Sequence, residues 1–262
     1  MLTQTFIHIQ GIGYATERRL WELGARTWEA FLAIRPQPRL PLSRAEDLPA
    51  AVAASLERLA AGDHRFFARR LPSRDHWRAL PEFGERILFL DIETDGGTEI
   101  DSVTVIGAHD GRQLHQFVRG QNLLDFPDLA DQAQLLVTFF GSGFDLPLLR
   151  RAFPRLPLDQ LHVDLCYALR RLGHRGGLKA IEREIGLARS ADTAGLNGWD
   201  AVRLWQEYRW GREDSLTTLR RYNAEDVENM RPLLAYAYER LRARALGEAW
   251  EECDIRNAER GM

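Results

Sequence analysis

The chain has 262 residues, of which 45% are hydrophobic and 28% are charged, so we expect a globular protein with one sizeable core and a small additional module. Its net charge of −3 excludes a polycation, its apolar runs are shorter than the roughly 18 residues of a membrane span, and its first residues, MLTQTFIHIQ, lack the features of a signal peptide. The short apolar runs indicate that the protein has no membrane partner. The two cysteines, Cys166 and Cys253, are too few for a disulfide framework or a zinc site, which indicates a reducing, cytoplasmic setting.

Residues 1–62 are expected to form a small helical module. Within them, residues 5–34 carry a helical pattern around a glycine turn, Gly11-Ile12-Gly13, and this stretch resembles a helix-hairpin-helix element. In that element the backbone amides at Gly11 and Gly13 hold a phosphate of a nucleic acid at the N-terminus of a helix. The alternative is an ordinary helical hairpin with a glycine turn.

Two connecting segments are predicted before the main domain. Residues 35–49 are rich in proline, and an alanine-rich amphipathic helix at residues 47–61 overlaps and follows them. Residues 63–84 are predicted to form a second connector, in which basic and aromatic side chains are interleaved. Such a segment can follow a single strand of nucleic acid. The alternative, which we favour, is that its aromatic side chains pack against the next domain.

Residues 85–242 have a pattern of strands followed by helices. RILFLDIET, IDSVTVIGAHD and RQLHQFVRG predict three strands of an antiparallel meander, and AQLLVTFFG and DQLHVDL predict two further strands. Helices are expected to start in FDLPLLRRAF and to cover residues 164–172, 177–186, 198–209 and 214–241, with Pro232 kinking or breaking the last one. This order predicts an α/β domain whose mixed five-stranded sheet, a meander extended by parallel strands, is flanked by helices. Residues 243–262 are expected to be a polar tail.

Two carboxylates, Asp91 and Glu93, are set into the apolar run LFLDIET of the first predicted strand. Side chains alternate along a strand, so both acids point to the same face, about 7 Å apart along the chain. Burying two like charges this close together is unfavourable unless a cation compensates them, and Mg²⁺ and Mn²⁺ prefer carboxylate oxygens. The alternative is that the strand ends at Leu90 and that the two acids begin a turn.

Two later motifs contain further candidates for the same site. In FFGSGFDLPLL, Asp145 follows a strand and a glycine-containing turn, and the alternative role for it is a helix N-cap. In RRYNAEDVENM, Tyr222 and Asp226 are four residues apart, so on a helix they share one face, about 6 Å apart along the axis. The alternative for this pair is an ordinary surface position.

The ordered set of D-x-E on a first strand, F-D after a later strand and Y-x-x-x-D on a late helix resembles the DEDD, or DnaQ-like, exonuclease superfamily in its tyrosine-containing DEDDy form. More closely, the chain is similar to the YprB-like ribonuclease H-like group, RNase_H_2, from about Arg78 to about Leu241. The resemblance implies a ribonuclease H-like fold. It also implies a nuclease that hydrolyses phosphodiester bonds in DNA or RNA with two divalent ions, Mg²⁺ or Mn²⁺.

By position, the resemblance implies that the ions are bound by four acids, Asp91, Glu93, Asp145 and Asp226. Asp91 would bridge the two ions, and Glu93 would help to hold the ion that activates water. Tyr222 would orient or deprotonate the attacking water, and the superfamily implies 3′→5′ cleavage of single-stranded ends. Two other interpretations are a non-catalytic nucleic-acid-binding adaptor with the same fold and a structure-specific endonuclease.

One stretch differs from the family pattern. Relatives often carry an asparagine a few residues before Asp145, where this chain has Phe140–Gly143. Its loss is expected to affect the grip on substrate and the rate rather than the metal site. Asp164, at a later strand end, is expected to cap the helix that follows it, and the alternative is a supporting role beside the metal ligands.

Basic side chains gather around a glycine turn in LRRLGHRGGLK. Arg170, Arg175 and Lys179 of this stretch are predicted to contact the phosphates of a nucleic acid, and the alternative is a solvated loop. Lys179 is the only lysine in the chain. No feature of the sequence identifies a protein partner.

Overall fold

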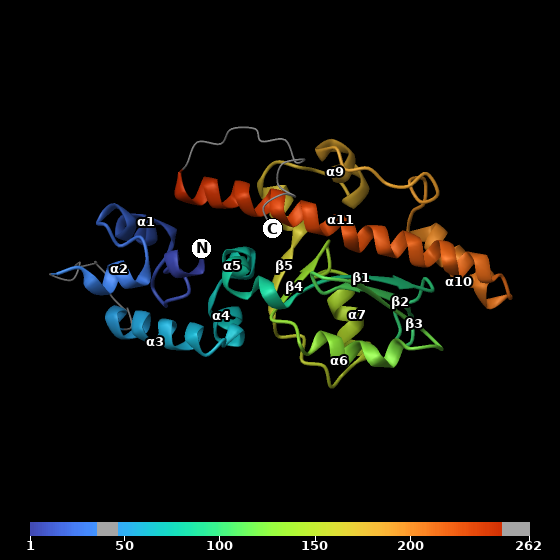
Figure 1. Cartoon of the computed structure of the whole chain (residues 1–262), viewed down its shortest axis with the longest axis horizontal. Coiled ribbons are helices and arrows are strands. Elements are labelled where there is room, and N and C mark those ends of the chain that lie inside the picture. The colour runs from blue at the N-terminus through green and yellow to red at the C-terminus, as the bar shows by residue number, and fades with distance from the viewer. Residues whose placement is uncertain (36–46, 248–262) are drawn as a thin grey trace. The chain divides into compact units, whose positions relative to one another are not determined.

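The computed structural model describes residues 1–35 and 47–247 (Figure 1). Part of the proline-rich stretch, residues 36–46, and most of the expected polar tail, residues 248–262, lie outside the described residues. The described residues divide into two compact units, residues 1–35 and 47–85 with 159–162, and residues 86–158 with 163–247.

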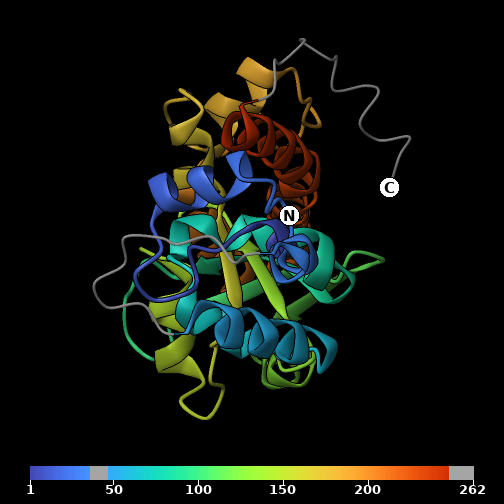
Figure 2. The ribbon, with the colours of Figure 1, turned by 90° about the vertical axis from the view of Figure 1, so that its left-hand side faces the viewer.

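The N-terminal unit is helical, as predicted (Figure 2). Its core is rich in aromatic side chains. Its elements are η1 (Leu2–Gln4), α1 (Tyr14–Glu22), α2 (Trp28–Ala33), α3 (Leu48–Ala60), α4 (His64–Arg70), η2 (Ser73–Ala79) and α5 (Leu80–Phe83), followed by η3 (Gly84–Arg86). Phe67 of α4 stacks on Trp28 of α2 with a centroid distance of 5.9 Å, and it lies at the same distance from Phe83 of α5. Residues 63–84 therefore contribute rings to the core of this unit, where large aromatic side chains bury the most apolar surface.

The second unit contains a five-stranded sheet in the order β3-β2-β1-β4-β5, although residues 161–162 of β5 group with the first unit. The strands are β1 (Ile87–Thr94), β2 (Val103–His109), β3 (Leu114–Val118), β4 (Leu135–Thr138) and β5 (Leu161–Asp164). β1 pairs antiparallel with β2 and β2 with β3, whereas β1 pairs parallel with β4. The predicted fold class, a mixed five-stranded sheet flanked by helices, is confirmed. The alternative in which the first strand ends at Leu90 is wrong, because β1 continues through both acids to Thr94.

The helices of this unit lie on both faces of the sheet (Figure 1). They are α6 (Phe126–Ala130), which follows η4 (Leu123–Asp125), α7 (Asp145–Ala152), α8 (Leu165–Arg171), α9 (Leu178–Ile185), α10 (Gly198–Arg209) and α11 (Glu213–Leu246). Leu90 and Ile92 of β1 are buried in a core shared with α6 and α7. On the opposite face, Val105 of β2 is buried with residues of α10 and α11. Since side chains alternate along a strand, Asp91 and Glu93 point toward α11.

Gly107 of β2 lets α11 come close to the sheet next to Asp91, its partner in the β1–β2 register. A Cβ atom at position 107 would lie 2.2 Å from Oδ1 of Asn223 and 2.9 Å from Cγ2 of Val227. Neither distance allows a side chain, so glycine is needed where the helix packs on the strand. The middle of α11 is thereby placed over Asp91.

α11 is a single helix of 34 residues that contains Pro232. Of the two expected effects of Pro232, a kink or a break, the break is wrong: the helix continues to Leu246, five residues beyond its predicted end at 241. Proline leaves the carbonyl of Glu228 without its helical donor, and Glu228 is exposed, so water can satisfy that group. Leu233 and Leu234 are buried directly after the proline, and this packing favours helix on both sides. Neither α11 nor another helix within residues 1–35 and 47–247 is apolar enough to cross a membrane.

Candidate metal centre

Three of the four predicted acids converge between β1 and α11. One carboxylate oxygen from each of Asp91, Glu93 and Asp226 lies within 4.8 Å of the other two. Glu93 and Asp226 are each 7% exposed, and Asp91 is half-buried. Because side chains alternate along β1, Asp91 and Glu93 lie on the same face of the strand. Asp226 lies on the side of α11 that faces them. Three carboxylates at this separation repel one another strongly unless protons or cations compensate them.

Asp145 is the first residue of α7 and lies beside this group without being part of it. Its Oδ1 accepts a hydrogen bond of 3.1 Å from the backbone N–H of Ile92, the residue between Asp91 and Glu93. The side chain is buried, with 3% exposed. The residue in the N-cap position of α7 is Phe144, so the N-cap alternative for Asp145 is wrong.

Asn223, one residue after Tyr222 on α11, fixes the orientation of Asp91. Its Nδ2 donates to Oδ2 of Asp91 at 2.9 Å and to the Asp91 carbonyl at 3.3 Å. Asn223 is fully buried, and a buried amide needs such partners to offset its desolvation. The contact holds one oxygen of Asp91 in place and leaves the other for a further ligand.

Burial and mutual repulsion raise the pKa values of the acids. The pKa of Asp91 lies well above its usual range because of burial and the neighbouring charges of Asp226, Glu93 and Asp145. The pKa of Glu93 is also raised well above its usual range, by burial and by Asp226 and Asp145. Burial raises the pKa of Asp145 to about 7 and shifts that of Asp226 upward, although Arg189 opposes the second shift. The site therefore favours bound protons or cations.

These shifts predict that the metal-free protein loses stability as the pH rises from 5 to 7. In this window the unfolded carboxyls are largely ionised, whereas Asp145, whose folded pKa is about 7, still holds its proton, and burial shifts the pKa values of Asp91 and Glu93 in the same direction. The folded state therefore binds more protons than the unfolded state, and the free energy of unfolding falls as the pH rises. The expected loss is about 1 kcal/mol per pH unit for each carboxyl that is still protonated. Urea unfolding in EDTA across this range measures it.

Two comparisons make the pH experiment specific. The variant Glu93→Gln should show a shallower slope, because one of the titrating groups is gone. Mg²⁺ should reduce the loss in the wild-type protein, since a cation stabilises the ionised carboxylates. A free energy of unfolding that stays level or increases from pH 5 to 7 in EDTA would contradict the raised pKa values.

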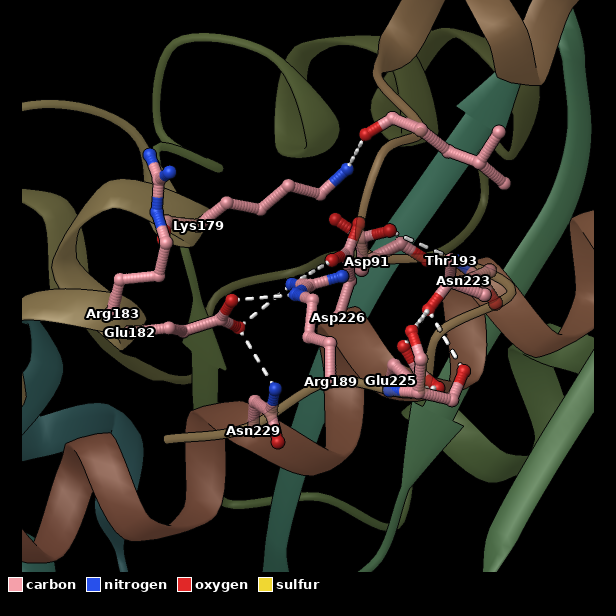
Figure 3. Close-up of polar contacts among 12 residues, drawn as sticks. Asp91, Lys179, Glu182, Arg183, Arg189, Thr193, Asn223, Glu225, Asp226 and Asn229 are labelled. Atoms are coloured by element: carbon pink, nitrogen blue, oxygen red, sulfur yellow. Dashed lines mark hydrogen bonds and ion pairs between the residues drawn. The ribbon is translucent and has the colours of Figure 1, made fainter. Parts of the chain in front are cut away.

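Arg189 supplies a positive charge to the centre from the segment between α9 and α10 (Figure 3). Its Nη2 is hydrogen-bonded to Oδ1 of Asp226, and its Nε and Nη2 contact the two oxygens of Glu182 at 2.5 and 2.7 Å. Asn229 of α11 donates to Glu182 at 3.0 Å. The side chains of Arg189 and Glu182 are only 6% and 1% exposed. A two-pronged guanidinium contact of this kind is geometrically demanding and strong when buried.

The same segment is attached to α11 at further points. The backbone N–H of Ser190 donates to Glu225 at 3.3 Å, and the hydroxyl of Thr193 donates to the other oxygen of Glu225 (Figure 3). Asp192 pairs with Arg221 at the surface. Arg189 is therefore held beside Asp226 by several independent contacts.

Lys179 and Tyr222 lie together at the edge of the acid group. The Lys179 ammonium is 4.1 Å from the centroid of the Tyr222 ring and donates to the carbonyl of Leu196. Tyr222 is 6% exposed, and burial together with the charges of Asp226 and Glu93 raises the pKa of its phenol. Lys179, predicted to contact nucleic acid, thus lies beside the predicted site residues of α11.

The other residues predicted to contact nucleic acid are placed as follows. Arg170 is exposed on α8, with its guanidinium 5.6 Å from the centroid of the Tyr167 ring, and Arg175 is exposed in the turn before α9. Gly11 and Gly13 are exposed in the N-terminal unit, where Gly13 is the N-cap of α1 and Gly11 has a φ of 87°. Phosphate binding by these four residues stays a prediction.

The donor set fits a hard divalent cation. Five carboxylates lie in and around the centre, and the cations beside them are Arg189 and Lys179, so negative charge is in excess if all the acids are ionised. All four predicted ligands are carboxylates, the type of ligand that Mg²⁺ and Mn²⁺ prefer. Asp91, Glu93 and Asp226 are the residues placed to share an ion, with Asp145 adjacent to them.

Sequence reasoning missed Arg189, Glu182 and the role of Asn223. Asn223 carried a usable signal: it is a polar residue on the apolar stripe of the last predicted helix, and a buried amide must have a partner. Arg189 and Glu182 had no such signal, because an arginine in an irregular segment is usually a solvated charge. The contact between Arg189 and Asp226 joins positions 37 residues apart and depends on the tertiary fold.

The match to a family model agrees with the fold. The family model RNase_H_2, of the RNase_H superfamily, matches residues 88–238. Among solved structures, the family B DNA polymerase from the hyperthermophilic archaeon Pyrobaculum calidifontis is similar, with a TM-score of 0.45 and 16% identity over 58% of this chain. The match covers 25% of the polymerase chain, so this chain corresponds to a small part of that protein. No curated protein matched. Since residues 88–238 include all the predicted acids and make up more than half of the sequence, the chain belongs to the RNase_H_2 family of the RNase_H superfamily.

Proposed function

We propose that the chain is a two-metal-ion nuclease, and specifically a 3′→5′ exonuclease of the DEDDy type that acts on single-stranded ends of DNA or RNA. The observation that carries this proposal is the convergence of Asp91, Glu93 and Asp226, with carboxylate oxygens within 4.8 Å of one another. Membership of the RNase_H superfamily supports the same class, since nucleases of this kind usually use divalent metals. The 3′→5′ direction and the single-stranded substrate come from the resemblance to DEDDy exonucleases.

Each acid has a role in this proposal. Asp91, Glu93 and Asp226 hold two ions, Mg²⁺ or Mn²⁺, and Asp145 is the fourth ligand. When bound, such ions supply an activated water and neutralise the charge that develops on the phosphate. Asn223 keeps Asp91 in one orientation through its 2.9 Å hydrogen bond, so the ligand does not have to be ordered when an ion binds.

Tyr222 is proposed to orient the attacking water as a hydrogen-bond donor. It lies one helical turn before Asp226 on the same side of α11, and it is buried. Because burial and the nearby acids raise the pKa of its phenol, the hydroxyl stays protonated at neutral pH. Of the two roles that the family resemblance implies, orientation of the water therefore fits better than deprotonation. The Lys179 ammonium at 4.1 Å from the ring centroid limits movement of the ring.

The variant Tyr222→Phe should lower kcat by about 10- to 100-fold and change KM by less than about threefold. The phenylalanine ring preserves the packing and removes only the hydroxyl that orients the water. Steady-state cleavage of a labelled single strand measures both constants. Tyr208→Phe, on α10, is the matched control, because its hydroxyl accepts a hydrogen bond from Gln121 outside the centre. An effect on KM alone would mean that Tyr222 contacts substrate instead.

Cleavage of end-labelled oligonucleotides tests the proposed function. Single- and double-stranded DNA and RNA, each labelled at the 5′ end, are incubated with the protein in Mg²⁺, Mn²⁺ or EDTA. The proposal predicts a ladder that shortens from the 3′ end on single strands and no reaction in EDTA. Internal cuts would indicate an endonuclease, and binding without cleavage in either metal would indicate a non-catalytic adaptor.

A further inference from the structure

An exposed pair of aromatic rings lies at the end of β4, outside the acid group. Phe140 is 43% exposed and Tyr167 of α8 is 44% exposed, and their ring centroids are 6.3 Å apart. Phe140 has a φ of 64°, in the left-handed region that a bulky residue rarely adopts. An unfavourable backbone conformation that presents a large apolar ring to solvent needs an explanation other than core packing.

The turn that carries Phe140 is fixed by specific contacts. Asp164 accepts hydrogen bonds from the backbone N–H groups of Phe140 and Ser142 at 2.8 and 3.1 Å, and from the Ser142 hydroxyl at 2.5 Å. The same carboxylate caps α8 through Cys166, so the expected N-cap role is confirmed and extended. A Cβ atom at Gly143 would lie 2.8 Å from Cζ of Phe140, so the turn leaves room for the ring where it lies. The backbone that carries the ring is therefore held in one conformation.

The turn that carries Phe140 leads to the acid group, and a positively charged side chain lies next to the pair of rings. The Phe140 turn leads directly into Asp145, whose carboxylate is hydrogen-bonded to Ile92 between Asp91 and Glu93. Arg170, one turn after Tyr167 on α8, places its guanidinium 5.6 Å from the Tyr167 ring centroid. The exposed rings, with a guanidinium over that of Tyr167, match the two parts of a nucleotide, a flat base and an anionic phosphate.

We propose that Phe140 and Tyr167 form a stacking site for an unpaired nucleobase of a single-stranded nucleic acid, with Arg170 at the adjacent phosphate. This inference rests on the proposed nuclease function and specifies its substrate. A base within a duplex has both faces covered by its neighbours, so only an unpaired, unstacked base can place a free face on the rings. Stacking also accepts any base, which suits an enzyme that must remove every nucleotide in turn.

Binding measurements with a protein variant and a modified oligonucleotide test the stack directly. The normal probe is a 5′-fluorescein single-stranded DNA of twelve nucleotides. A second probe is identical except that its last three nucleotides at the 3′ end lack their bases. Fluorescence anisotropy is measured with Ca²⁺ in place of Mg²⁺, and gels confirm that the probe remains intact. Phe140→Asn removes the ring while asparagine tolerates the left-handed backbone, so the variant should melt at or above the wild-type temperature.

The expected result is a loss of binding that depends on the bases. Phe140→Asn should weaken binding of the normal probe by about 5- to 100-fold, the range for loss of one base stack. The probe without bases should bind the wild type more weakly than the normal probe by a similar factor. For Phe140→Asn the two probes should differ by less than about twofold. Trp210→Ala, which removes an 80% exposed ring from the end of α10, should leave binding unchanged. Equal losses for both proteins on base removal would overturn the proposal, as would absence of binding to the wild type.

The outcome separates this inference from the proposed nuclease function. If the protein cleaves from the 3′ end, but base removal weakens binding equally in the wild type and in Phe140→Asn, the stacking site is refuted and the nuclease proposal stands. If binding depends on the bases and on Phe140, but no cleavage occurs in Mg²⁺ or Mn²⁺, the nuclease proposal is refuted and the stacking site stands.

Discussion

Asp91→Asn should abolish nucleic-acid cleavage and leave the metal-free protein at least as stable as the wild type. Asp91 is central to the acid group, and its pKa is raised by burial and by the three neighbouring acids. An amide resembles the protonated carboxyl in shape and can still accept the hydrogen bond from Asn223. The substitution therefore removes repulsion from the fold while it removes a metal ligand. We expect a loss of at least about 100-fold in kcat, the scale of losing one electrostatic stabiliser in an active site.

Melting curves recorded in EDTA and in Mg²⁺ provide a second readout for Asp91→Asn. Mg²⁺ should raise the Tm of the wild type, because ligands that bind only the folded state stabilise it. The variant should lose most of that increase. Asp192→Asn is the matched control, since Asp192 is 64% exposed at its side chain and pairs with Arg221 outside the acid group. Wild-type cleavage by Asp91→Asn would show that the ligand assignment is wrong.

Arg189→Met should destabilise the metal-free protein by about 3–5 kcal/mol, as expected when one partner of a buried ion pair is removed. The methionine fills part of the arginine volume but leaves Asp226 and Glu182 without the guanidinium that contacts both. Each of these acids is at least nine-tenths buried, so water cannot replace the lost charge efficiently. Urea unfolding in EDTA measures the change.

Two further measurements identify the cause of the Arg189 effect. Mg²⁺ should recover part of the lost stability, because an ion bound at Asp226 supplies positive charge where the guanidinium was. Arg221→Met is the control: it breaks an exposed pair between the same segment and α11 and should change stability by less than about 1 kcal/mol. If both variants lose the same amount, Arg189 acts only by attaching the segment, and the charge argument fails.

The fold could be predicted because its signals are local. The alternation in LFLDIET indicated a strand with both acids on one face, and the structure places Asp91 and Glu93 together on the α11 side of β1. The antiparallel meander followed from short turns between strands. Pro232 shows the limit of local rules, since the buried leucines after it keep α11 helical through the proline.

The candidate centre could be predicted only in part. The ligand set came from the order of motifs in a family resemblance, and the structure brings three of its four acids into one group, with Asp145 next to it. The residues that support those acids could not be predicted, because Arg189 and Asn223 act through contacts that exist only after β1, α11 and the α9–α10 segment have packed. A pattern in the sequence identifies side chains that share an element, and it does not identify the counter-charge that a distant segment supplies.

Lys179 can serve as a chemical probe of access to the centre. The sequence has no other lysine, so an amine-selective reagent has one side-chain target in the chain. That amine lies 4.1 Å from the Tyr222 ring centroid, and burial lowers its pKa, which increases the neutral, nucleophilic fraction. The rate at which Lys179 is acylated, read by mass spectrometry, will therefore report on access to the centre, and a bound oligonucleotide or metal ion can be detected as protection of a single residue.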